Sequence, residues 1–123
     1  MSTDEHAAGG RILIFAGGLC GATGVVLSAA SAHLGGAFVG TAASFLLMHA
    51  PVFFVVGLLG GNIILRSGSL ILLVGLLLFS GDLLARDFLG SRLFPMSAPI
   101  GGTLLIGGWL VMAASALVRP RRH

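Results

Sequence analysis

The chain has 123 residues, of which 56% are hydrophobic and 9% are charged. A soluble domain carries about 25% charged residues, so this chain has too few charges to cover a surface that faces water. The composition therefore excludes a soluble domain and predicts an integral membrane protein. The net charge of +3 comes from arginines at the ends of apolar segments. Without a basic stripe that also carries aromatic residues, this charge predicts no nucleic-acid partner.

Residues 12–32 form the first apolar segment, and a helix needs about 20 such residues to cross a bilayer. The segment also resembles a signal peptide, because Ala30-Ser31-Ala32 has the A-x-A pattern of a cleavage site. Asp4 and Glu5 before the segment, and its length, argue against that interpretation. We therefore expect a transmembrane helix here, with Cys20 as a small packing residue inside it.

Three further apolar segments follow, at about residues 41–65, 70–86 and 99–118. Pro51 should kink the helix of the second segment, and the third is long enough only if Asp82 and Arg86 lie within it. Backbone groups in lipid must bond internally, so all four segments should be helices. The sequence predicts one all-α domain, an up-down bundle of four transmembrane helices. Residues 1–10 and 119–123 should be flexible cytoplasmic tails.

The arginines predict the orientation of the chain in the membrane. With four spans, both termini and the middle loop share one side, and this side holds five arginines: Arg11, Arg66, Arg119, Arg121 and Arg122. The opposite side holds Arg86 and Arg92. Cytoplasmic flanks carry the excess of positive charge. We therefore expect a multi-pass protein of the bacterial inner membrane with both termini in the cytoplasm.

Glycine spacing predicts the faces through which the helices pack, because small residues let helix backbones approach closely in lipid. Two G-x-x-x-G patterns and two seven-residue repeats occur. The patterns are Gly17/Gly21 and Gly57/Gly61, and the repeats are Gly101/Gly108/Ser115 and Gly68/Gly75/Asp82. A seven-residue repeat keeps one face toward a partner helix, so Asp82 should share the inward face of Gly75.

Polar residues within the spans suggest a candidate cluster in the outer half of the membrane, since such residues are usually functional. Its members are His33, His49, Ser80, Asp82 and Arg86. Each also has a simpler interpretation: His33 as a helix end, His49 as a hydrogen bond between helices, and Asp82 with Arg86 as an i, i+4 salt bridge. We expect Asp82 to contact either Arg86 or His49.

Other features point to structural roles. We expect Asp87 and Arg92 to be solvated loop charges and Trp109 to be buried packing in the middle of its span. No catalytic motif or phosphate-binding loop occurs. Two histidines without a further ligand make a weak metal site, so we expect no enzymatic activity, metal or cofactor.

Four stretches resemble, in order and spacing, the YgdD-like family of small inner-membrane proteins (domain of unknown function 423), which has animal mitochondrial relatives. They are SAASAHLGG, FLLMHAPVFFVVGLL, GLLLFSGDLL and SAPIGGTLLIGGWLVMAASAL, within residues 17–118. The resemblance implies a four-helix membrane protein of unestablished role, with His33, His49, Ser80 and the turn at residues 99–102 as shared positions. Asp82 and Pro51 depart from the family pattern, so a role for Asp82 cannot be taken from the family.

Two functions are compatible with the sequence. The first is a non-enzymatic accessory or assembly component of a larger membrane complex, or a homo-oligomer, because the chain is small, has glycine-rich faces and shows no segment expected to form a soluble head. The alternative is a small proton-coupled transporter or channel that uses His49 and Asp82.

Overall fold

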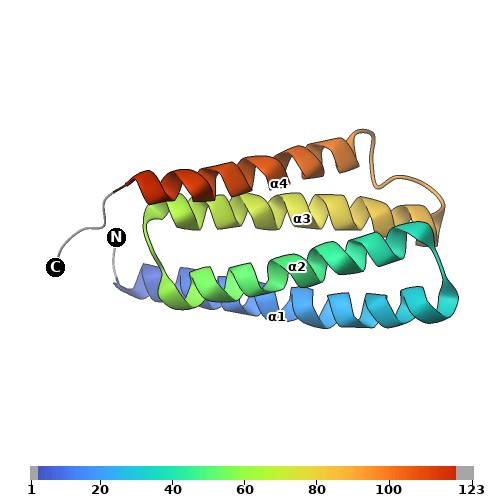
Figure 1. The fold of residues 1–123 in the computed structure, drawn as a ribbon, viewed down its shortest axis with the longest axis horizontal. Helices are drawn as coiled ribbons and strands as arrows, with labels where there is room; N and C mark the ends of the chain where they lie inside the picture. The colour runs from blue at the N-terminus through green and yellow to red at the C-terminus, as the bar shows by residue number, and fades with distance from the viewer. Residues whose placement is uncertain (1–2, 119–123) are drawn as a thin grey trace.

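The computed structural model describes the backbone of residues 3–118 and the side chains of residues 8–118. Four helices run back and forth: α1 (Thr3–Leu34), α2 (Ala37–Leu59), α3 (Ile63–Leu89) and α4 (Ser97–Ala114), followed by a short 3-10 turn, η1 (Ser115–Leu117) (Figure 1). Each of the four spans is long and apolar enough to cross a membrane. The predicted fold class, an all-α protein with four transmembrane helices, is confirmed.

The helix boundaries differ from the predicted ones at the turn between α2 and α3. The second helix ends at Leu59 rather than near residue 65 because Gly60 and Gly61 adopt positive φ angles of 76° and 84°, which favour glycine. Asn62, predicted inside the second helix, instead begins the third: its side-chain oxygen accepts a hydrogen bond from the Leu65 N–H at 2.8 Å. Such a cap satisfies a backbone donor that a helix start leaves free.

All four helices begin earlier in the chain than predicted, and α4 ends earlier, at Ala114. α1 begins at Thr3, so most of the segment predicted as a flexible N-terminal tail is helical. α2 begins at Ala37, after Gly35 and Gly36 with positive φ angles. It runs without interruption through Pro51. The predicted C-terminal tail, residues 119–123, lies outside the described residues.

Glycines bring the helices together in two pairs, α1 with α2 and α3 with α4, and α2 packs on α3 to join the pairs. In the first pair, a Cβ at Gly17 would lie 2.9 Å from the Ala50 carbonyl oxygen, and one at Gly57 would lie 2.8 Å from the Gly10 carbonyl oxygen. In the second pair, a Cβ at Gly75 would lie 2.8 Å from the Gly101 carbonyl oxygen. Side chains larger than hydrogen would therefore force these backbones apart.

The remaining glycines that the sequence predicted as packing residues differ in how closely they contact a neighbouring helix. Gly101 and Gly108 meet the backbone of α3, at Phe79 and Leu72 respectively. Gly21 makes only an ordinary contact, because a Cβ there would lie 3.8 Å from the Ala50 Cβ. Gly61 lies in the turn after α2 and not on a helix, so the predicted Gly57/Gly61 face does not form.

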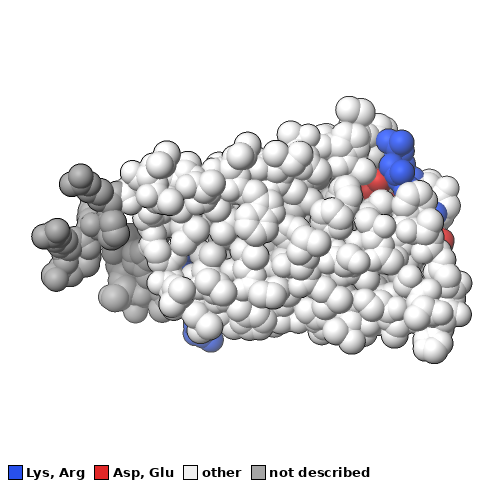
Figure 2. Space-filling view, in the orientation of Figure 1, with Lys and Arg blue, Asp and Glu red and all other residues white. Residues whose placement is uncertain are grey.

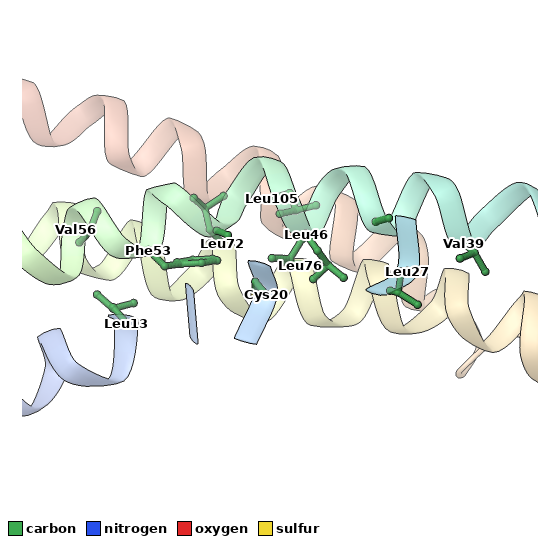
Figure 3. Packing of buried hydrophobic residues seen from close by; sticks show 12 residues of the cluster. Leu13, Cys20, Leu27, Val39, Leu46, Phe53, Val56, Leu72, Leu76 and Leu105 are labelled. Carbon is green, nitrogen blue, oxygen red and sulfur yellow. The ribbon is translucent and has the colours of Figure 1, made fainter. Parts of the chain in front are cut away.

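A single apolar core runs along the four helices (Figure 3). Phe53 of α2 and Leu72 and Leu76 of α3 are fully buried at the junction of the two pairs, with Leu13 of α1 fully buried against them. Cys20 belongs to this core and is 5% exposed, which agrees with its expected packing role. α1 and α4 lie at the two edges of the molecule in the view of Figure 1.

Candidate functional site

Asp82 is fully buried, and both of its carboxylate oxygens are engaged. Oδ1 accepts hydrogen bonds from the Ser97 hydroxyl at 2.6 Å and from the Leu93 N–H at 3.0 Å. Oδ2 lies 3.0 Å from Nε of Arg86, an ion pair in which the N–H is not aligned with the oxygen. The ion pair forms because α3 continues regularly past Gly81 to Leu89, so that residues four apart lie on one face. Arg86, and not His49, is therefore the partner of Asp82.

These bonds hold the connection between α3 and α4 against the end of α3. Met96, just before α4, has a φ of 69°, a left-handed conformation that costs a residue other than glycine about 1 kcal/mol or more. Asp82 bonds to Leu93 before this residue and to Ser97 after it. The buried carboxylate thus fixes both sides of the strained position and sets where α4 begins.

Asp87 bonds to the start of α2 and is not the solvated loop charge that the sequence predicted. Its Oδ2 accepts hydrogen bonds from the backbone N–H groups of Phe38 and Val39 at 3.0 and 2.7 Å. The residue before the helix, Gly36, offers no side chain to bond these donors, so α3 supplies the acceptor. A carboxylate at a helix N-terminus is also favoured by the helix dipole. The guanidinium of Arg86 lies 5.4 Å from the centroid of the Phe38 ring and adds a cation–π contact.

His49 is 2% exposed, and its two bonds fix its tautomer. Nδ1 lies 2.8 Å from the Phe45 carbonyl oxygen, which can only accept, so Nδ1 carries the proton. Nε2 lies 3.2 Å from Nε1 of Trp109, which can only donate, so Nε2 is the acceptor. His49 is therefore a neutral imidazole with both nitrogens in use, and it connects α2 to α4.

Trp109 is a polar partner as well as a packing residue. Its side chain is 43% exposed, so the expectation of a buried packing residue is wrong. The indole N–H of Trp109 on α4 donates a hydrogen bond to Nε2 of His49 on α2, and the centroids of the two rings lie 5.7 Å apart. Phe45 stacks on the other side of His49 and also contacts Phe79 of α3, with ring centroids 4.8 Å apart. His49 thus sits in an aromatic cluster formed by α2, α3 and α4.

The structure divides the predicted polar cluster instead of bringing it together. Asp82 and Arg86 are joined, but no hydrogen bond or ion pair of the described residues connects them to His49. His49 lies about 12 residues from the start of α2 at Ala37, which is about 18 Å of helix rise and near the middle of the span. The expectation of an outer position rested on a helix start at residue 41. His33 is exposed at the end of α1, and Ser80 is buried with no hydrogen-bond partner for its hydroxyl.

The arrangement of these residues is suited to holding helices in place. Asp82 accepts hydrogen bonds through Oδ1, Asp87 through Oδ2 and His49 through Nε2, and Asp82 Oδ2 pairs with Arg86. Among residues 8–118, no group of three or more His, Cys, Asp or Glu side chains is placed to hold a metal ion. The structure adds Ser97, Asp87 and Trp109 to the sequence-predicted residues, and each bonds a residue at least 15 positions away along the chain.

Comparison with known proteins agrees with this membrane architecture. The model of the family described as "Protein of unknown function (DUF423)" matches residues 20–102. A UPF0382 membrane protein of Haemophilus influenzae is 49% identical over 41 residues, a match that covers 33% of each chain. No solved structure matches the chain. The family match spans most of the chain and all or part of each helix, and the protein is therefore a multi-pass membrane protein of the DUF423 family.

Proposed function

We propose that this protein is a non-enzymatic accessory or assembly component of a larger complex in the bacterial inner membrane. The observation that supports this role most directly is the surface of α4. Its buried residues, Ser97, Gly101, Leu105 and Gly108, form a single strip against α3, and the rest of its circumference is largely exposed. An apolar edge helix of this kind is available to a second membrane protein.

Two glycines on α4 strengthen the argument. Gly102 and Gly107 are the only glycines within the four described helices at which an added Cβ would meet nothing within 4 Å. A glycine inside a helix costs about 1 kcal/mol relative to alanine, and at most other glycines of the described helices close packing offsets that cost. At Gly102 and Gly107 the chain itself provides no such packing. Contact with another helix would provide it.

The polar residues favour this role over proton-coupled transport. A transporter of this size would need acidic or imidazole groups that exchange protons with a water-filled path. Here the Asp82 carboxylate is fully buried, with hydrogen bonds to Oδ1 and the Arg86 ion pair at Oδ2, and His49 is hydrogen-bonded at both nitrogens. These two residues belong to separate clusters, and no hydrogen bond among the described residues links them.

A photo-crosslinking experiment tests the proposal. A benzophenone side chain placed at the exposed Leu110 of α4 should form a discrete adduct with another membrane polypeptide in cells. The same group at the exposed Leu19 of α1, at the other edge of the molecule, is the matched control and should form none. Gly107→Leu should weaken the Leu110 adduct, because the added side chain lies on the same outward part of α4.

The possible outcomes separate the candidate roles. An adduct whose mass is twice that of the chain identifies a second copy as the partner, and a larger assembly after mild-detergent extraction identifies a complex. Adducts with lipid alone, together with a lone chain after extraction, would contradict the proposal. Proton uptake by proteoliposomes that is lost in both Asp82→Asn and His49→Gln would instead support transport.

A further inference from the structure

A hollow of about 520 Å³ opens where α1 begins, between α1, the end of α2 and the start of α3. Of the described residues that line it, two are charged, and both are arginines: Arg11 of α1 and Arg66 of α3. The other described lining residues are glycine, leucine or isoleucine. The described part of the lining is therefore cationic.

Three glycines leave the space that the Arg66 side chain occupies. A side chain at Gly9 would collide with its guanidinium, and a Cβ at Gly10 or Gly60 would lie 3.9 Å from Nη2. Arg66 is only 8% exposed, so this cation is held inside the protein between α1 and the turn after α2. Arg66 has a further interaction within the chain. A guanidinium has five N–H donors, so one group can bond to more than one partner.

The position of the hollow identifies the depth at which a ligand would bind. It lies where the spans Ala8–Leu34 and Ile63–Leu89 begin and the span Ala37–Leu59 ends, which is the depth of lipid headgroups. On the face seen in Figure 2, the charged side chains of the described residues lie toward the two ends, with an uncharged surface between them. Arg11 is exposed at this end and can approach a ligand from the membrane surface.

We propose that this hollow binds a phosphate group through Arg11 and Arg66. Guanidinium groups bind phosphate oxygens through paired, charge-assisted hydrogen bonds, and basic pockets between transmembrane helices bind anionic headgroups. The phosphate belongs either to an anionic phospholipid or to a soluble phosphate compound. This inference is independent of the accessory role, because it concerns the opposite edge of the molecule from the exposed face of α4.

Binding of short-chain lipids to the full-length protein in a neutral detergent tests the site. Dioctanoyl phosphatidylglycerol should bind, and Arg11→Gln and Arg66→Gln should each weaken its binding about fivefold, as expected for one arginine at a membrane surface. Arg11→Lys keeps the charge but loses the planar guanidinium with its paired N–H donors, so its affinity for the lipid should be intermediate. Arg92→Gln is the matched control, since Arg92 is exposed at the other end of the molecule, and it should bind as the wild type does.

Inorganic phosphate distinguishes the two sources. If it competes with the lipid at equal concentrations, the site recognises soluble phosphate; if it does not compete, the lipid is the ligand. Equal binding by wild type, Arg11→Gln and Arg66→Gln would overturn the proposal, as would an equal loss in Arg92→Gln, which would indicate diffuse charge attraction. Should Arg66→Gln fail to fold, the exposed Arg11 still decides the outcome.

Discussion

At the residue scale, the charged side chains inside the spans stabilise one another. The Asp82 carboxylate has no access to solvent, whereas the Arg86 side chain is 24% exposed, so the ion pair lies at the boundary between the core and the headgroup region. Removing one member of a buried pair leaves the other without compensation, which costs more than the pair itself contributes. The connection from α3 to α4 depends on the same carboxylate.

Asp82→Asn should therefore lower the free energy of unfolding by about 1–3 kcal/mol, because it removes the charged acceptor. Ser97→Ala, which removes one of the donors to Asp82, should cost about 1 kcal/mol. Ser91→Ala, an exposed change at the same end, should stay within about 0.5 kcal/mol. Unfolding of the purified protein by titration with a denaturing detergent measures these differences. An Asp82→Asn protein as stable as the Ser91→Ala control would contradict the assigned role.

His49 provides a second prediction, concerning its tautomer. Nitrogen NMR of the imidazole near neutral pH should show a neutral ring that carries its proton on Nδ1. Trp109→Phe removes the donor to Nε2 and should change the Nε2 shift while leaving the Nδ1 proton in place. The loss of stability should be small, about 0.6 kcal/mol, the average for hydrogen bonds between membrane helices. A ring protonated on both nitrogens in the wild type would disprove the assignment.

The sequence predicts these residue contacts only where they are local. Asp82 with Arg86 follows from i, i+4 spacing, and the inward direction of Asp82 follows from its register with Gly75. Asp87 illustrates the limit. The Gly35-Gly36 pair indicates a helix start without a capping side chain, but the acceptor lies 48 residues from Val39. Only the packing of α2 against α3 identifies it.

At the element scale, glycine determines how closely α3 and α4 approach. Gly75→Ala should destabilise the protein by about 1–3 kcal/mol, because the new Cβ would lie 2.8 Å from the backbone of Gly101 and Leu105. Gly75→Leu should prevent folding. Gly107→Ala is the matched control on the facing helix, and its Cβ meets nothing within 4 Å. In the isolated protein it should be neutral or stabilising by up to about 1 kcal/mol.

Thermal unfolding in detergent distinguishes these variants. Equal stability of Gly75→Ala and Gly107→Ala would show that the α3–α4 contact does not depend on glycine. The number of helices and the heptad face of α3 could be predicted from apolar length and glycine spacing. Helix ends could not be predicted as well, because positive-φ glycines at positions 60 and 61, and not a loss of hydrophobicity, end α2.

At the scale of the whole molecule, four helices place the start of α1 and the end of η1 at the same end (Figure 1). Asn62 strengthens this end, since its side-chain amide donates to the Ser115 carbonyl at 3.1 Å and ties the α2–α3 turn to η1. Arg11 and Arg66 therefore lie at one end of the molecule, where α1 starts and η1 ends, while Arg119, Arg121 and Arg122 lie outside the described residues. Arg86 belongs to the opposite end, where α3 finishes.

This charge distribution predicts that both termini face the cytoplasm. A green fluorescent protein fused after His123 should fluoresce, and alkaline phosphatase inserted after Gly90 should be active, because in this orientation that turn would face the periplasm. Replacing Arg119, Arg121 and Arg122 with glutamine leaves two arginines on each side, so the orientation should become mixed. Arg92→Gln widens the difference in the number of arginines between the two sides. It should therefore keep the wild-type orientation and serves as the control. Active phosphatase at the C-terminus of the wild type would contradict the prediction, because the five arginines on that side would then face the periplasm.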